Sequence, residues 1–142
     1  MPRIFSLIAI SCLAFSLGCS EPERGGPRVK TSPASGVVKV DGVEAAYLQV
    51  ECHPGEGSSI KYPLSTLTDE KGAFSLGTYE AGDGLPAGSY TLTFTWLEPG
   101  LAPFDKLKGA YANPKNAEHT ITIVEDVESA PSVIELKTKK GR

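Results

Sequence analysis

The segment Tyr90-Thr91-Leu92-Thr93-Phe94-Thr95-Trp96 shows the clearest alternation of apolar and hydroxylated side chains in this sequence. Successive side chains of a β-strand point to opposite faces, so its four apolar residues would share one face and its three threonines the other. Aromatic and β-branched residues are also enriched in strands. The segment therefore predicts a half-buried strand, with Tyr90 and Trp96 packed in the core.

Six shorter segments on either side repeat the period of two and are separated by glycine, proline and aspartate turns. They lie at residues 36–40, 47–53, 64–68, 74–76, 120–123 and 134–137. No stretch carries the apolar stripe of a helix, and residues 98–117 are expected to form a long connection between sheets. Seven short strands predict a single all-β domain, an antiparallel β-sandwich over residues 35–139.

The composition agrees with one small domain and excludes several classes of protein. With 142 residues the chain has room for one domain of ordinary size, which excludes a multidomain enzyme. Glycine (15) and proline (11) supply many turns, while 40% of the residues are hydrophobic and can fill a core. The 14 basic and 17 acidic residues give a net charge of −3, so no nucleic acid is expected among the partners.

The first 18 residues are typical of a signal peptide. Arg3 precedes an apolar stretch at residues 4–17. As a helix, that stretch would rise only about 21 Å, whereas the hydrocarbon core of a membrane is roughly 30 Å thick. We therefore expect a signal peptide at residues 1–18 instead of a membrane-spanning anchor.

The end of this region, Phe15-Ser16-Leu17-Gly18-Cys19-Ser20, resembles the signal of bacterial lipoproteins. In that family a small residue precedes a cysteine that is acylated and becomes the first residue of the mature chain. The resemblance implies cleavage between Gly18 and Cys19 and lipidation of Cys19, although the family usually has leucine where this chain has Ser16. Ser20 is not the aspartate that retains such proteins at the inner membrane, which implies the outer membrane, facing the periplasm or the cell surface. The alternative is an ordinary secretory peptide that leaves Cys19 as a free thiol.

Residues 19–34 are rich in proline, glycine and charge and hold little that a core could bury. Such a composition predicts a flexible tether between Cys19 and the folded domain. Two or more acyl chains on Cys19 would hold that domain at the membrane, because each buried methylene contributes about 0.8 kcal/mol. At the other end of the chain, residues 140–142 are predicted to form a solvated basic tail.

Four segments after the tether resemble transthyretin-like, or carboxypeptidase-regulatory-like, domains of the kind found on planctomycete-type lipoproteins. The matching segments are Ser35-Gly36-Val37-Val38-Lys39-Val40-Asp41-Gly42, Thr68-Asp69-Glu70-Lys71-Gly72-Ala73-Phe74, Thr78-Tyr79-Glu80-Ala81-Gly82-Asp83-Gly84-Leu85-Pro86-Ala87-Gly88-Ser89-Tyr90 and Tyr111-Ala112-Asn113-Pro114. The resemblance implies a seven-stranded Greek-key sandwich of the transthyretin-like (prealbumin-like) type at the cell envelope. It implies no catalytic residues, since such domains generally serve as non-catalytic modules.

Few residues have the types and spacing that a reactive site or a metal site needs. Cys52 and His53 are consecutive on a predicted strand, so their side chains point to opposite faces and do not share a metal. Cys52 has the parity of Leu48 and Val50 and is expected to be a buried, inert thiol. His119 is expected near the surface at a strand end. We therefore expect no metal, no cofactor and no enzymatic activity.

Two groups of loop residues have more than one interpretation. The carboxylates of four turn residues are interpreted as solvated, with a weak calcium site as the alternative. These residues are Asp69, Glu70, Glu80 and Asp83. Tyr47 and Tyr62 are predicted to be exposed, but two isolated aromatic residues do not define a sugar-binding platform.

Two functions are consistent with these expectations. The first is a non-enzymatic, lipid-anchored module of the cell envelope for protein interaction, adhesion or scaffolding, whose partners are the membrane and an unidentified envelope protein or glycan. An exposed strand edge would suit the addition of a partner strand. The alternative is a small-ligand or carbohydrate-binding module that uses the loop end of the sandwich, which predicts a cleft lined by Tyr79, Asp83 and Tyr111.

Overall fold

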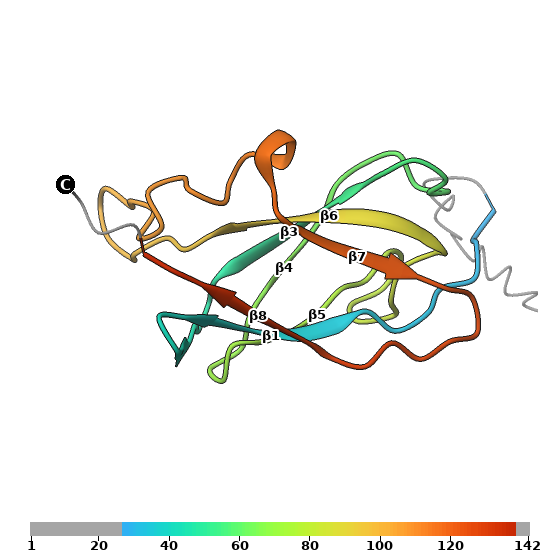
Figure 1. Ribbon diagram of the computed structural model, residues 1–142, viewed down its shortest axis with the longest axis horizontal. Coiled ribbons are helices and arrows are strands. Elements are labelled where there is room, and N and C mark those ends of the chain that lie inside the picture. Colours follow the sequence, from blue (N-terminus) through green and yellow to red (C-terminus); the bar gives the residue numbers. More distant parts are fainter. Residues whose placement is uncertain (1–26, 139–142) are drawn as a thin grey trace, which may run out of the picture.

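The computed structural model of the protein describes residues 27–138 (Figure 1). The predicted signal peptide at residues 1–18, the proposed lipidation site at Cys19 and the tail at residues 140–142 lie outside the described residues. Within residues 27–138, no helix is both long enough and apolar enough to cross a membrane.

Residues 27–138 are all-β and form two sheets, which confirms the all-β part of the predicted fold. Residues 27–138 contain eight strands and one short 3-10 helix. They are β1 (Ser35–Val40), β2 (Val43–Glu44), β3 (Gln49–Pro54), β4 (Leu64–Leu67), β5 (Ala73–Ser75), β6 (Gly88–Thr95), η1 (Pro114–Asn116), β7 (His119–Ile123) and β8 (Ser132–Leu136). One sheet has the order β2-β1-β5 with β8 also paired to β1, and the other has the order β4-β3-β6-β7 (Figure 1).

The predicted number of strands and their uniform antiparallel pairing were wrong in two details. The additional strand is β2, which pairs with the end of β1 because Asp41 and Gly42 both adopt positive φ and reverse the chain. The second difference is β8, which runs parallel to β1 over residues 132–136. A period of two identifies a strand and its buried face, but it does not specify the neighbouring strand or its direction.

Alternate residues of both sheets fill one hydrophobic core. Tyr90 is 1% exposed, and its hydroxyl donates to the carbonyl oxygen of Pro86 at 2.7 Å and accepts from Ser58 at 3.1 Å. The predictions of core packing for Tyr90 and burial for Cys52 are therefore confirmed. Trp96 is only partly buried against the core, because β6 ends one residue before it and the chain then leaves the sheet.

The sheets have two distinct ends. The near end holds residue 27 and three connections, namely residues 55–63, 76–87 and 124–131 (Figure 1). The far end holds the β1–β2 turn and the connection between β6 and β7, beside the last described residues at the C-terminus (Figure 1). The described chain therefore enters the domain at the near end and leaves it at the far end.

Residues 28–34, which we call the docked segment, lie against the connection between β5 and β6. The backbone of Ser32 forms a two-way bridge to Leu85, with N···O distances of 2.9 and 3.0 Å. The hydroxyl of Thr31 donates to the carbonyl oxygen of Asp83 at 2.7 Å. Ala34 is 1% exposed. Residues 28–34 therefore belong to the folded unit, and the predicted tether over residues 19–34 was wrong for these last seven residues.

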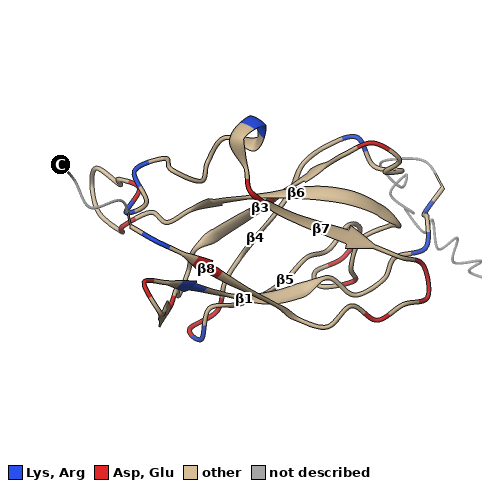
Figure 2. Cartoon of the chain, in the orientation of Figure 1, with Lys and Arg blue, Asp and Glu red and all other residues tan. Residues whose placement is uncertain are grey.

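Charge also holds the docked segment in place. Figure 2 shows acidic residues along the connection between β7 and β8. Lys30 forms an ion pair with Asp126 and lies 4.0 Å from a carboxylate oxygen of Glu125. These charges raise the pKa of Lys30, chiefly through the hydrogen bond to Asp126. A composition-based prediction misses such a segment, because its partners are backbone groups and carboxylates far away in the sequence.

Candidate functional site

The structure does not bring together the three residues of the predicted ligand-binding cleft. Tyr79 and Asp83 lie in the connection between β5 and β6 at the near end. Tyr111 lies beside the other half of β6, where its carbonyl oxygen accepts from the N–H of Phe94 at 3.0 Å. Most of β6 separates the two places, a distance of roughly 20 Å at the rise of an extended strand. The expected cleft is therefore absent from residues 27–138.

Asp83 and Tyr79 instead have structural roles at the near end. The carboxylate of Asp83 accepts from the N–H groups of Thr78, Tyr79 and Glu80 at 2.6, 3.1 and 3.2 Å, which closes the connection on itself. The hydroxyl of Tyr79 accepts from the N–H of Val29 at 2.8 Å and so holds the docked segment. The Asp83 carboxylate was interpreted as solvated, but it is instead occupied by the N–H groups of its own turn.

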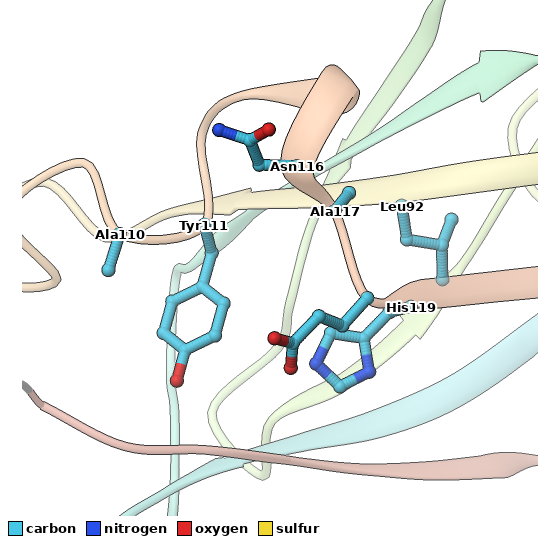
Figure 3. Close-up of a pocket in the computed structure, with 7 residues that line it drawn as sticks. Leu92, Ala110, Tyr111, Asn116, Ala117 and His119 are labelled. Carbon is cyan, nitrogen blue, oxygen red and sulfur yellow. The ribbon is translucent and has the colours of Figure 1, made fainter.

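Tyr111 and His119 line a small cavity between the β6–β7 connection and the start of β7 (Figure 3). Its volume is about 140 Å³, and the remaining lining residues are Leu92, Ala110, Asn116, Ala117 and Glu118. The ring of His119 packs edge-on against Phe94, with 5.5 Å between the centroids. The hydroxyl of Tyr111 is already engaged, because it donates to the carbonyl oxygen of Lys137 at 3.2 Å and accepts from the N–H of the same residue at 3.0 Å.

A larger and more apolar cleft lies at the far end, and we call it the far-end cleft. Its volume is about 640 Å³, within the range of small-ligand and peptide pockets. The residues that line it come from the turn between β2 and β3 and from the chain after β6. They are Ala46, Tyr47, Trp96, Leu97, Glu98, Pro99, Gly100, Pro103 and Lys106. Most of its surface is apolar, which makes it the strongest candidate for a binding site.

One wall of the far-end cleft is a hairpin that extends β6 beyond the sheet. The N–H of Lys106 donates to the carbonyl oxygen of Trp96 at 2.8 Å, and that of Glu98 donates to Phe104 at 3.0 Å. The carboxylate of Asp105 accepts from three N–H groups at 2.7 to 2.9 Å. The donors are Trp96, Leu107 and Gly109. Because Asp105 fixes the hairpin, the cleft is formed before any ligand arrives.

Two aromatic side chains form the centre of the far-end cleft. Tyr47 is 62% exposed and has a φ of 57°, a conformation that is a genuine outlier for a bulky residue and that clusters at functional positions. Its hydroxyl donates to Glu70, whose negative charge raises the pKa of Tyr47. Trp96 donates from its indole nitrogen to the carbonyl oxygen of Ala46 at 2.9 Å. Both polar tips are therefore occupied, and the rings contribute mainly apolar surface.

Charge and apolar side chains surround these two rings. The ammonium group of Lys106 lies 4.4 Å from the centroid of the Trp96 ring, a cation–π contact. Leu97 and Phe104 are exposed on the hairpin, and the side chain of Leu101 at its tip is fully exposed. Contiguous exposed apolar residues of this kind mark interaction sites.

Sequence reasoning missed the far-end cleft for an identifiable reason. Residues 98–117 contain no regular alternation, so they were predicted only to connect the sheets. That prediction was wrong, because the segment joins β6 and β7, which are neighbours in the same sheet. The exposure of Tyr47 and Tyr62 was predicted correctly, but Tyr47 is not isolated, since it lines the same cleft as Trp96. The available sign was a group of leucine and phenylalanine residues within a segment rich in proline and glycine.

The residues considered for reactive chemistry have ordinary structural positions. Burial raises the pKa of the Cys52 thiol to about 12. A ring nitrogen of His53 is hydrogen-bonded to the hydroxyl of Thr93 at 2.9 Å, on the face opposite to Cys52. Among residues 27–138, no group of three or more histidine, cysteine, aspartate or glutamate side chains lies close enough to hold a metal ion.

Searches against protein families, curated proteins and solved structures each found no match to this chain. The function of this chain is therefore argued from the far-end cleft and the docked segment.

Proposed function

We propose that this protein is a non-enzymatic, lipid-anchored module of the bacterial cell envelope that binds a partner protein through the far-end cleft. The observation that carries this proposal is the position of the cleft at the end of the domain opposite the docked segment. If Cys19 carries the lipid, residues 20–27 separate it from the docked segment, a reach of about 26 Å when extended. The domain then stands close to the membrane with its cleft directed away from it.

The chemistry of the far-end cleft favours a protein partner. A sugar needs several directional hydrogen bonds, but the hydroxyl of Tyr47 and the indole nitrogen of Trp96 are both engaged within the domain. The exposed leucine and phenylalanine residues on the hairpin extend the apolar surface beyond the cleft. Aromatic anchors within an apolar centre are typical of protein interfaces.

The resemblances found in the sequence complete the proposal. The two sheets support the transthyretin-like interpretation, in which they form a Greek-key sandwich. Ser20 after the proposed lipidation site supports the outer membrane, facing the periplasm or the cell surface. A Cys19→Ala chain is expected in the soluble fraction, whereas the wild-type chain stays with the membranes. Continued membrane association of the Cys19→Ala chain contradicts the anchor.

Partner binding is tested by exchanging one exposed side chain at each end of the domain. Tagged full chains carrying Leu101→Asp or Tyr62→Asp are recovered from their own envelope and compared with wild type. Leu101→Asp should lower the amount of co-purified partner about tenfold, because it places a charge on the exposed apolar tip of the hairpin that forms one wall of the cleft. Tyr62, exposed at the near end, provides the matched control. Equal recovery with both variants contradicts the proposed site.

Glycan binding is the second candidate, and one observation favours it. The side chains of Glu98 and Lys106 line the far-end cleft beside the rings of Tyr47 and Trp96, so a stacked sugar would meet two charged groups. The chain contains one tryptophan, and its fluorescence therefore reports on the cleft alone. Saturable quenching by envelope polysaccharide would favour this candidate over the protein partner.

A further inference from the structure

The free edge of strand β8 presents a defined set of backbone groups. Within residues 27–138, β8 pairs with β1 alone, in parallel. Along a parallel strand, the N–H and C=O groups of alternate residues point to opposite sides. The carbonyl oxygen of Leu136 accepts from the N–H of Asp41 at 2.9 Å, so Leu136, Ile134 and Ser132 direct their groups toward β1. The residues between them direct theirs away from the sheet.

The same alternation is visible on β1. Val38 directs its backbone groups away from β8, since its N–H donates to Gly72 at 2.8 Å and its carbonyl oxygen accepts from Ala45 at 3.0 Å. The hydrogen bonds on both strands therefore agree on which groups of β8 face outward.

Three residues of β8 and its continuation direct their backbone N–H and C=O groups outward. Only one of the three, Lys137, has these groups hydrogen-bonded within residues 27–138. The outward N–H and C=O of Lys137 are both bonded to the hydroxyl of Tyr111. The outward groups of Val133 and Glu135 have no hydrogen-bond partner among residues 27–138. Pro131, just before the strand, has no N–H to offer. Within β8 itself, the free edge therefore consists of four groups on two residues, with Tyr111 closing one end and only the carbonyl of Pro131 continuing the alternation at the other.

The side chains beside this edge define what could pair with it. Val133 is 65% exposed, and Glu135 is exposed and makes no ion pair within residues 27–138. An unpaired edge with an exposed β-branched side chain is a template for another strand. Opposite charges and apolar pairs across neighbouring strands stabilise such pairing. A complementary strand would place a cation opposite Glu135 and an apolar residue opposite Val133.

We propose that β8 accepts an extended peptide strand from a partner protein, with lysine or arginine opposite Glu135 and a β-branched residue opposite Val133. In antiparallel pairing, the partner therefore carries the pattern basic–any–apolar. A second copy of the chain fits less well, because the register that uses all four free groups places Val133 opposite Glu135 of the other copy. This surface is separate from the far-end cleft, and the proposal does not depend on that cleft.

The probe is a synthetic peptide, acetyl-Ser-Thr-Lys-Thr-Val-Thr-Ser-amide, added to the isotope-labelled full chain in phospholipid nanodiscs. We expect saturable binding, together with shifts and slower hydrogen exchange of the Val133 and Glu135 amides in NMR spectra. A peptide with glutamate in place of lysine should bind roughly threefold more weakly. Glu135→Lys should reverse this preference. An unchanged preference in that variant overturns the proposed register.

A second variant removes a backbone donor from the edge. Val133→Pro deletes an N–H that bonds to nothing in the described domain, so the thermal midpoint should stay close to that of wild type. Peptide affinity should fall roughly fivefold. Leu101→Asp should leave it unchanged, which separates this edge from the cleft. Unchanged binding by Val133→Pro, or a dimer in sedimentation experiments that this variant disperses, overturns the proposal.

Discussion

Cys52 shows how the position of one side chain sets its chemistry. Its shared parity with Leu48 and Val50 predicted burial, and the structure places it in the core. Burial without a compensating charge disfavours the thiolate, which explains why the pKa rises from its usual value near 9 to about 12. A thiol in this position is protected from reagents that attack the thiolate.

The pH dependence of stability provides a test of that burial. Because the pKa is higher in the folded chain, the folded state keeps the proton over a range in which the unfolded chain has lost it. The contribution of the protonated Cys52 thiol to the free energy of unfolding is therefore complete below pH 9. It is lost as the pH rises from 9 toward about 12. In urea unfolding, the free energy of unfolding of wild type should fall more steeply over this range than that of Cys52→Ala. Parallel curves would show that the thiol is accessible.

Asp105 is the residue that the far-end cleft depends on most. Replacing it with alanine removes the acceptor for three N–H groups and should lower the free energy of unfolding by about 2 kcal/mol. Asp105→Asn keeps a carbonyl oxygen that can accept from the N–H groups of Trp96 and Leu107. It should therefore lower the free energy of unfolding by roughly half as much. Urea unfolding measures both. Equal losses would mean that the hydrogen bonds are not the cause.

At the scale of single residues, the sequence predicted whether a side chain faces the core or the solvent better than it predicted the hydrogen-bond partners of that side chain. The parity of Tyr90 and Cys52 identified both as buried, because alternation is a local property of a strand. It did not anticipate that Tyr111 would close the edge of β8 or that Asp105 would bind three N–H groups. Both depend on contacts that the chain makes only after it leaves a strand.

The docked segment is the main difference between prediction and structure at the scale of elements. All seven predicted strands are present, with their boundaries displaced by one or two residues. Residues 28–34 were assigned to a tether because they are polar, yet they pair with a connection that follows β5. Backbone hydrogen bonding does not require hydrophobic side chains, so composition alone does not report it.

Two glycines with similar backbone conformations test the docked segment. A side chain at Gly84, with a φ of 91°, would place its Cβ 2.1 Å from the carbonyl oxygen of Ser32, whereas one at Gly57, with a φ of 80°, meets nothing within 4 Å. Both alanine variants should lose about 1 kcal/mol through strained backbone. Only Gly84→Ala should release the docked segment and speed protease cleavage within residues 28–34. Equal cleavage of the two variants would contradict the docking.

At the scale of the whole molecule, the two ends of the domain have different chemistry. The near end gathers the docked segment and its acidic partners (Figures 1 and 2). The far end carries the apolar cleft and the exposed hairpin. The edge of β8 runs between these ends. If Cys19 carries the proposed lipid, this separation would leave the cleft and the edge accessible to other molecules while the domain is attached from its near end.

Site-specific photo-crosslinking tests the binding role of the far end most directly. A photoreactive residue replaces Phe104, which is 59% exposed on the hairpin, or Tyr62, which is 51% exposed at the near end, in the full chain within its own envelope. We predict a discrete protein adduct from position 104 that Leu101→Asp abolishes, and no such adduct from position 62. Adducts of equal yield from both positions, or an adduct at position 104 that Leu101→Asp leaves unchanged, would contradict a partner-binding cleft.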